Sequence, residues 1–384
     1  MVFRKIDINS GLLAMFLSTT CLASIMDAII SIPYASVFMA LIIAVVLIAV
    51  NYRSFLFTRS SIIAYLCVLS VLLISLVLNN WNTFGVRYTL FFIVFGTTAL
   101  LLTGVKVNYK TAFLIWVCIS ILYLIQELFL PGIDALKQSD MGVEQMGLAY
   151  SFVPSALLGG SFLVSSKLRR SCKVSYIIIG VVLLIGASYI ILFRTVTRGA
   201  ILSVLLGFFL LSWVVSGKQR RNWIISILLC VGLLVYLNID SILDGFIAMF
   251  QNSEIGALKK MVSFMGSDNV SNGRDLLYAN AITYIKERPI LGHGVGYFES
   301  HNGIYVHQLL LQLMCEVGVV GMILFLVPFT RLFHRILNTK YALFQSYTYV
   351  IALSSTFVML LFSNAHWLLP TFWYLYFVSL NSYD

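Results

Sequence analysis

Charged residues are scarce in this chain of 384 residues: they make up 10% of it, whereas 60% of the residues are hydrophobic. A soluble globular domain is excluded, because so few charges cannot cover an apolar core with a hydrated surface. Only 6 residues are proline, and neither a Pro-rich or Ser-rich linker nor an internal repeat divides the chain. We therefore predict an all-α integral membrane protein that forms a single membrane domain over residues 1–384.

Several chemical motifs are also missing. The 6 cysteines stand singly with no C-x-x-C pair, which argues against a disulfide framework and a zinc site. There is no Walker motif, no D-x-D pattern for metal-assisted transfer from a nucleotide sugar, and no paired intramembrane carboxylates. His293, His301 and His307 have spacings that suit no standard metal site. We predict a protein that uses no metal and no cofactor.

Long apolar runs dominate what is present. A run of roughly 17–25 apolar residues can cross the bilayer as a helix, and about twelve such runs occur. Nothing resembles a cleaved signal peptide, so the first run is expected to be a spanning helix. The predicted spans are 10–31, 34–50, 61–79, 88–104, 111–130, 147–166, 174–193, 198–216, 222–239, 304–328, 341–361 and 364–381.

The net charge of +10 could suggest a nucleic-acid partner, but the distribution of the charge argues against one. Basic residues concentrate in alternate connections between the runs, which is the positive-inside pattern. Both termini are therefore expected in the cytoplasm. The opposite side carries a shorter loop, 131–146, and one long loop, 240–303, between the ninth and tenth helices. Within the long loop, "NGRDLLYANAITYIKERP" predicts a helix over 272–289 that Pro289 ends.

Three arginines on the outer side are candidates for binding an anion. Arg194 and Arg198 lie four residues apart, so in a continuous helix both guanidinium groups would share a face. Guanidinium groups match phosphate in a bidentate geometry, and the helix that begins at Arg198 would point its N-terminal amides the same way. Arg274 opens the loop helix, where a positive charge opposes the helix dipole. The alternatives are that the first two reach lipid headgroups and that Arg274 pairs with Asp275 or is solvated.

The stretch "GHGVGYFESHNGIYVHQLLLQLMCEVG" joins the long loop to the tenth helix. His307 is expected in the first turn of that helix, where a neutral imidazole could accept a proton, or could simply hydrogen-bond the loop. Glu316 follows nine residues later on the opposite face, so a dyad with His307 is not expected. We predict a buried structural contact for Glu316. Glu127 could belong to an ion pathway or face the loop.

Three motifs in order resemble the O-antigen polymerase and O-antigen ligase superfamily of bacterial envelope enzymes. They are "TRGAIL", "GRDLLYANAITYIKERPILGHGVGYF" and "YVHQLLLQLMCEVGVVG". Thr197 stands where the family usually has serine, and Gln308 where it usually has asparagine. Both keep a hydrogen-bonding side chain. The resemblance implies a fold like that of the C-type membrane glycosyltransferases, in the bacterial inner membrane, with the active site facing the periplasm.

The resemblance also implies roles for single residues. Arg198 and Arg274 would bind the diphosphate of an undecaprenyl-diphosphate-linked oligosaccharide, and His307 would be the catalytic base. Arg194 is a further candidate for binding the diphosphate because of its spacing from Arg198. Tyr278, Tyr297 and Tyr305 could offer faces for sugar stacking, although aromatic residues are also expected at a membrane interface. Membrane lipids and a chain-length regulator protein are candidate partners, and no nucleic acid is expected.

Three functions compete. The leading prediction is an O-antigen polymerase that joins lipid-linked repeat units. The alternative is an O-antigen ligase that transfers the finished glycan to the lipid A core, with the same donor and the same arginines. A transporter is less well supported, because the two halves of the chain share no pattern and the polar residues collect at the outer surface rather than at the midplane.

Overall fold

The computed structural model describes residues 2–30, 34–129, 143–195, 197–216, 245, 248–249, 274–338 and 341–381. Helices and turns make up these segments, and no strand occurs among them. The chain is therefore all-α, as the sequence predicts. The predicted span 222–239, most of the predicted loop 131–146 and about half of the predicted loop 240–303 lie outside the described residues.

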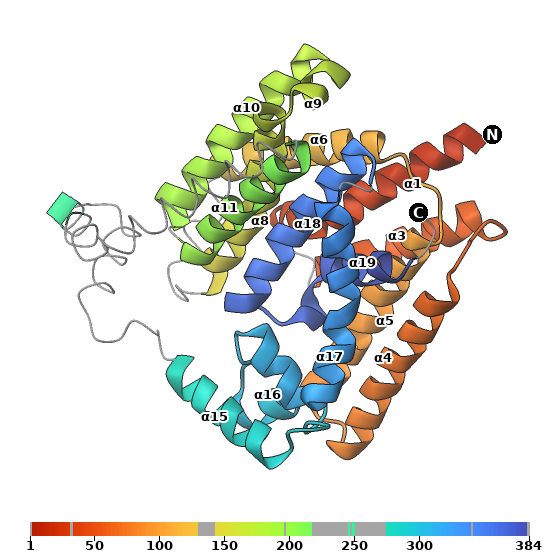
Figure 1. The fold of residues 1–384 in the computed structure, drawn as a ribbon, viewed down its shortest axis with the longest axis vertical. Coiled ribbons are helices and arrows are strands. Elements are labelled where there is room, and N and C mark those ends of the chain that lie inside the picture. Colours follow the sequence, from red (N-terminus) through yellow and green to blue (C-terminus); the bar gives the residue numbers. More distant parts are fainter. Residues whose placement is uncertain are drawn as a thin grey trace.

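The helices pack into one bundle, in which the N-terminal helices lie beside the C-terminal ones (Figure 1). Their bounds are as follows: α1 Val2–Leu17, α2 Thr19–Ile30, α3 Ala35–Asn51, α4 Arg59–Leu78, α5 Thr83–Thr103, α6 Tyr109–Phe129, α8 Val143–Val164, α9 Ser166–Ser171, α10 Val174–Tyr189, the π-helix η1 Ile190–Thr195, α11 Arg198–Val215, α15 Arg274–Glu287, α16 Tyr297–Asn302, α17 Leu309–Leu337, α18 Leu343–Phe362, the 3₁₀-helix η2 His366–Leu368 and α19 Pro370–Leu380.

Among the described residues, 8 helices are long and apolar enough to cross a membrane. They are α4, α5, α6, α8, α10 together with η1, α11, α17 and α18. A further helix pair, α1 and α2, would count as a ninth span, but the two axes are bent by 75° at their junction. The predicted single span 10–31 is therefore broken at Ser18, which separates the two helices. The protein is thus a polytopic membrane protein of helical bundle type.

The predicted last span, 364–381, is wrong. This stretch forms η2 followed by α19, which has only 11 residues and starts at Pro370. At 1.5 Å per residue, such a helix extends about 16 Å and cannot cross the hydrocarbon core. Most of its side chains are buried, including Phe372, Trp373 and Phe377. The apolar composition of α19 reflects burial in the protein core rather than contact with lipid.

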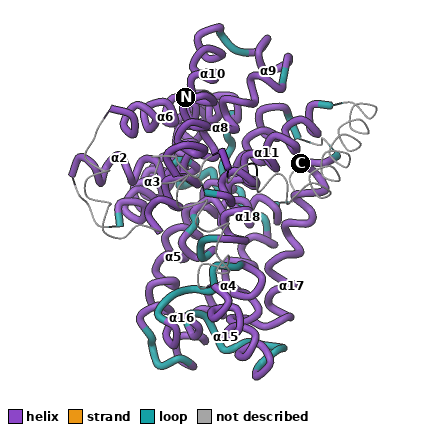
Figure 2. Tube along the Cα trace, turned by 90° about the vertical axis from the view of Figure 1, so that its left-hand side faces the viewer, coloured by secondary structure: helices purple, strands orange, loops and turns teal. Residues whose placement is uncertain are grey.

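The described part of the long loop lies at one end of the bundle. Figures 1 and 2 show α15 and α16 next to the start of α17, whereas α9 and α10 reach the opposite end. The predicted helix 272–289 is confirmed as α15, Arg274–Glu287. A small apolar cluster of Ala281, Phe298, Val306 and Cys315 fastens α15 and α16 to α17.

Candidate active site

The glycine-rich turn before α16 docks into a break in α17. Gly318 leaves the helical conformation with φ 65° and ψ −173°. Across this break, the N–H groups of Val319 and Val320 donate to the carbonyl oxygens of Pro289 and Ile290, at 2.9 and 3.4 Å. A Cβ atom at Gly318 would lie 2.1 Å from the oxygen of Ile290, so only glycine fits there.

The turn also donates hydrogen bonds to α17. The N–H groups of His293 and Gly294 donate to the carbonyl oxygens of Cys315 and Glu316, at 2.8 and 2.9 Å. A Cβ atom at Gly292 would lie 2.5 Å from the backbone of Glu316. The clustered glycines thus let two backbone segments approach closely, and this contact fixes the turn and α16 on the membrane domain.

His307 lies before α17 and not in its first turn, which corrects the prediction from sequence. The helix begins at Leu309, and Gln308 is its N-cap, because the Gln308 side chain accepts a hydrogen bond from the N–H of Leu311. His307 has φ 62°, a left-handed conformation that is uncommon outside glycine. The imidazole is therefore presented on a strained turn, and such turns are frequent at functional sites.

The imidazole of His307 is buried, with 6% of the side chain exposed. It packs against the ring of Tyr305 and hydrogen-bonds the backbone of Ser363, whereas its Nδ1 has no hydrogen-bond partner among the described residues. Burial and, secondarily, the charge of Arg274 lower the pKa of His307 to about 4, against a smaller opposing effect of the Ser363 hydrogen bond. The imidazole is thus neutral at physiological pH and has a nitrogen able to accept a proton.

Arg274 is the first residue of α15, and its guanidinium group points toward α8. Its Nη2 contacts the sulfur of Met146 at 3.8 Å, and the hydroxyl of Ser363 contacts the same sulfur at 3.7 Å. The charge of Arg274 acts on His307, Tyr305 and Tyr150. Arg274 and His307 are thereby brought together from separate elements.

Arg198 is the first residue of α11 and is exposed. Thr197, the N-cap, has an extended backbone and makes no side-chain hydrogen bond to the first turn of α11. Gly199 lies against α8: a Cβ atom there would lie 1.8 Å from the hydroxyl of Tyr150. Because Tyr150 also lies within reach of the charge of Arg274, it links the start of α11 to the start of α15.

Arg194 does not share a helix face with Arg198, so the prediction from their spacing is wrong. Arg194 belongs to η1, and the extended Thr197 separates η1 from α11. Its Nη1 donates to the carbonyl oxygen of Glu127, at 2.9 Å. The guanidinium group of Arg194 is thus held at the end of α6.

The three candidate tyrosines lie in different surroundings. Tyr305 contacts His307, and Tyr278, one turn after Arg274, packs on the apolar cluster that includes Val306. Tyr297 instead stacks between His293 and His301, with ring centroids at 4.4 and 4.2 Å, near the far end of α15. Tyr278 and Tyr305 are therefore close to the arginine and histidine, and Tyr297 is not placed with them.

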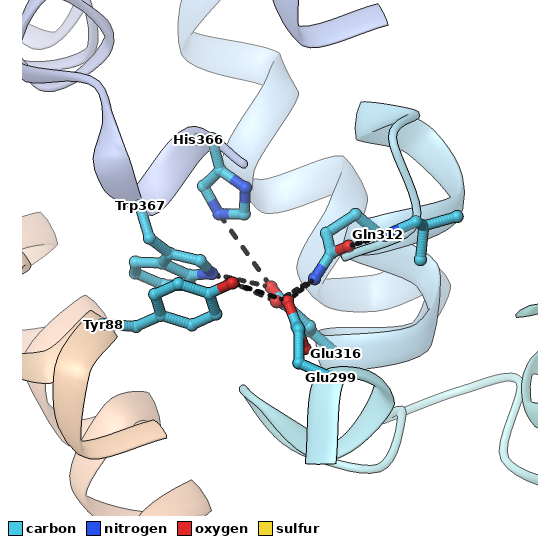
Figure 3. Close-up of polar contacts among 7 residues, drawn as sticks. Tyr88, Glu299, Gln312, Glu316, His366 and Trp367 are labelled. Carbon is cyan, nitrogen blue, oxygen red and sulfur yellow. Dashed lines mark hydrogen bonds and ion pairs between the residues drawn. The ribbon is translucent and has the colours of Figure 1, made fainter. Parts of the chain in front are cut away.

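A buried polar network next to His307 was not predicted from the sequence (Figure 3). The predicted buried contact of Glu316 is confirmed: Trp367 Nε1 donates to its two carboxyl oxygens at 3.1 and 3.0 Å. The further members are Gln312 and Glu299, together with Tyr88. A glutamine four residues before a glutamate on a membrane helix is the one sequence signal that could have indicated them.

Residues 179–326 match a protein-family model described as O-antigen ligase. This match includes Arg194, Arg198, Arg274 and His307, and it confirms the resemblance to the O-antigen polymerase and ligase superfamily. No curated protein matches the chain significantly. The fold is that of a polytopic, helical membrane protein. The match supports a function of the O-antigen polymerase or ligase type. Among the described residues, no cluster of three or more His, Cys, Asp or Glu side chains could hold a metal ion.

Proposed function

We propose that the protein is an O-antigen polymerase. It transfers a glycan from an undecaprenyl diphosphate donor to a sugar hydroxyl of another lipid-linked repeat unit. In this step, the acceptor oxygen bonds to the anomeric carbon of the donor while the bond from that carbon to the diphosphate breaks. The hydroxyl proton passes to His307, and undecaprenyl diphosphate leaves.

The observation that carries this proposal is the state of His307 beside Arg274. A base must be neutral to accept a proton, and the lowered pKa of His307 keeps it neutral across the physiological range. In this proposal the proton passes to Nδ1, which has no hydrogen-bond partner among the described residues. The charge of Arg274, which disfavours imidazolium, is suited to the leaving diphosphate.

Arg198 and Arg274 hold the diphosphate in this proposal. Both begin a helix, and the exposed Arg198 is accompanied by N–H groups that lack a side-chain cap. Guanidinium groups and free backbone amides together stabilise the negative charge that develops on the leaving group, without a metal. Arg194, held at Glu127, contributes at most to the local positive potential.

The site faces the periplasm in this proposal. Basic residues concentrate in the connections at the α9 end of the bundle, which the positive-inside rule assigns to the cytoplasm, together with the termini. The helices α15 and α16 lie at the opposite end (Figure 1). A lipid-linked donor in the outer leaflet would then reach His307 from that side.

Purified protein with lipid-linked repeat units tests the proposal. We expect elongated glycans, no loss of activity in excess chelator, and a loss of about 10²- to 10⁴-fold in turnover for His307→Gln, the range for a positioned base. Donor binding should persist in that variant. Near-normal turnover by His307→Gln would refute the base, and loss of activity in chelator would refute the metal-free mechanism.

The ligase is the second candidate, because the matching family model is described as O-antigen ligase and the match does not distinguish the two functions. The two functions share donor and leaving group and differ in the acceptor. Deletion in the native host separates them. Surface glycans limited to a single repeat unit are expected for a polymerase, whereas long lipid-linked glycans that never reach lipid A would indicate a ligase.

A further inference from the structure

Gln312 links the turn of His307 to two buried carboxyl groups (Figure 3). It lies one turn into α17, with 2% of its side chain exposed. Its Oε1 accepts a hydrogen bond from the N–H of Val306, at 2.9 Å. Its Nε2 donates to Glu299, at 2.8 Å, and to Glu316. Val306 directly precedes His307, so the amide holds the backbone that presents the imidazole.

The orientation of this amide is fixed by its neighbours. A glutamine side chain has an acceptor oxygen and a nitrogen with two donor hydrogens. The oxygen faces a backbone donor, and the nitrogen faces two carboxyl groups. A flipped amide would place its N–H groups against the N–H of Val306 and leave that backbone donor without its acceptor. A buried polar group without a partner is costly, so the flipped state is disfavoured.

The two carboxyl groups are themselves held by other elements. Tyr88 on α5 donates to Glu299, at 2.9 Å, and Trp367 on η2 donates to Glu316. Glu299 belongs to α16 and Glu316 to α17. The Gln312 amide and the two carboxyl groups thus connect four elements: α5, α16, α17 and η2. The turn before α17 is thereby fixed relative to α5 and η2 as well as to its own helix.

We propose that Gln312 is a positioning residue for His307. It does not touch the substrate. Acting through the N–H of Val306, it holds the strained turn that buries the imidazole against Tyr305 and directs it to the site. This inference rests on the proposed function only where it concerns turnover. The orientation and burial of His307 can be measured whatever reaction the protein catalyses.

The test compares Gln312→Met with Gln345→Met. Methionine keeps the length of the side chain and removes both hydrogen-bonding groups. Gln345, near the start of α18, donates to the hydroxyl of Tyr349, at 3.2 Å. Gln345→Met is the control, because it makes the same chemical change at a position away from the turn of His307. Two measurements are made in detergent or nanodiscs: the pKa of His307 by NMR of labelled histidine, assigned with His307→Gln, and turnover with lipid-linked repeat units.

For Gln312→Met, we expect the pKa of His307 to rise from about 4 toward 6.5, because a loosened turn admits water. Turnover should fall by up to about 10²-fold, the effect of a small misplacement of a reacting group, with the KM for donor within about twofold. Gln345→Met should leave both values unchanged. Combining Gln312→Met with His307→Gln should lower turnover no further than His307→Gln alone.

The outcomes separate the two proposals. A pKa of His307 that stays near 4 in a folded Gln312→Met protein would overturn the positioning role, whatever the turnover. A raised pKa with unchanged turnover would support the positioning role and count against His307 as the base. If Gln312→Met does not fold, Tyr88→Phe removes one oxygen from the same network. A smaller rise in the same pKa is then expected, and no rise would overturn the proposal.

Discussion

The ring of Tyr305 lies against the imidazole of His307, with 4.2 Å between ring centroids and an angle of 48° between the planes. The hydroxyl of Tyr305 donates to the carbonyl oxygen of Ser363, at 2.7 Å, and the imidazole hydrogen-bonds the backbone of the same residue. The segment after α18 therefore anchors both rings. One face of Tyr305 is occupied by His307, so stacking on a sugar could use only its other face.

The pH dependence of activity should reflect the lowered pKa of His307. The ordinary value for histidine is about 6.5, and the base works only when neutral. Because the pKa in the folded protein is about 4, kcat/KM should hold as the pH falls through 6.5 and decline only near pH 4. Arg274→Gln removes one cause of the lowered pKa and should move this decline to higher pH. A wild-type decline centred near pH 6.5 would contradict the assignment.

Lysine at Arg198 or Arg274 should impair transfer while leaving expression intact. Lysine keeps the charge but loses the planar fork that binds two oxygens at once. The loss of one charge-assisted hydrogen bond, worth about 1.5–3 kcal/mol, corresponds to roughly a 10- to 100-fold lower kcat/KM. Arg87→Lys serves as the control, because Arg87 lies on α5 over the ring of Tyr34. Normal polymerisation by both site variants would exclude the diphosphate role.

Neutralising Arg194 should have a milder effect on transfer than either site variant, since its guanidinium group is held by the carbonyl oxygen of Glu127 at the end of α6. Arg194→Gln can still donate a hydrogen bond to a carbonyl oxygen. The measurement is kcat/KM with lipid-linked repeat units, alongside Arg274→Gln. An effect of Arg194→Gln as large as that of Arg274→Gln would place Arg194 in the donor site after all.

Glu299 should tolerate glutamine and not leucine. Burial raises the pKa of the Glu299 carboxyl group above its ordinary value, which favours the protonated form. Its Oε1 accepts hydrogen bonds from Tyr88 and Gln312, and its Oε2 has no partner among the described residues. A glutamine oxygen can accept both bonds. Leucine would leave two buried donors unpaired, at about 1–3 kcal/mol each.

The apparent melting temperature of protein purified in detergent checks this expectation for Glu299. Glu299→Gln should melt close to the wild type and Glu299→Leu clearly lower. Equal losses for the two variants would show that the charged carboxylate, rather than its hydrogen-bond geometry, is what the network requires.

Gly318→Ala should prevent correct folding of the N-terminal end of α17. The new Cβ atom would meet the backbone of Ile290, and the positive φ is unfavourable for alanine. Gly11→Ala in α1 is the matched control, because its Cβ atom would make only an ordinary contact with Ile115 of α6, at 3.8 Å. The readout is the yield of monodisperse protein. A Gly318→Ala protein as abundant and stable as Gly11→Ala would contradict the close packing of Gly318 against the backbone of Ile290.

Composition and local signals were enough to predict much of the fold. The helix α15 could be predicted from the spacing of its apolar residues and from Pro289, because both signals are local in the sequence. Hydropathy failed at α19 and at the bend near Ser18. A window average measures how apolar a run is, and it distinguishes neither burial in protein from contact with lipid nor a straight helix from a broken one.

The site could be predicted only in part, for a related reason. Arg274 and His307 stand in recognisable motifs, but the left-handed turn at His307 depends on a hydrogen bond from Val306 to Gln312, which no local pattern specifies. The separation of Arg194 from Arg198 likewise results from the π-helix and the extended Thr197. Spacing arguments assume regular geometry, and the structure departs from it at these positions.

The docking of the glycine-rich turn into the break of α17 has a consequence for membrane insertion. Cys315, Glu316, Val319 and Val320 find backbone partners in the turn that precedes α17 in the chain. In a bilayer, unpaired backbone groups cost several kcal/mol each. Since this turn is synthesised before α17, it is in place to pair with the break as α17 enters the membrane. An insertion between Gly296 and Leu309 that delayed this pairing would be expected to expose the protein to membrane quality control, even if the mature fold could accommodate the extra residues.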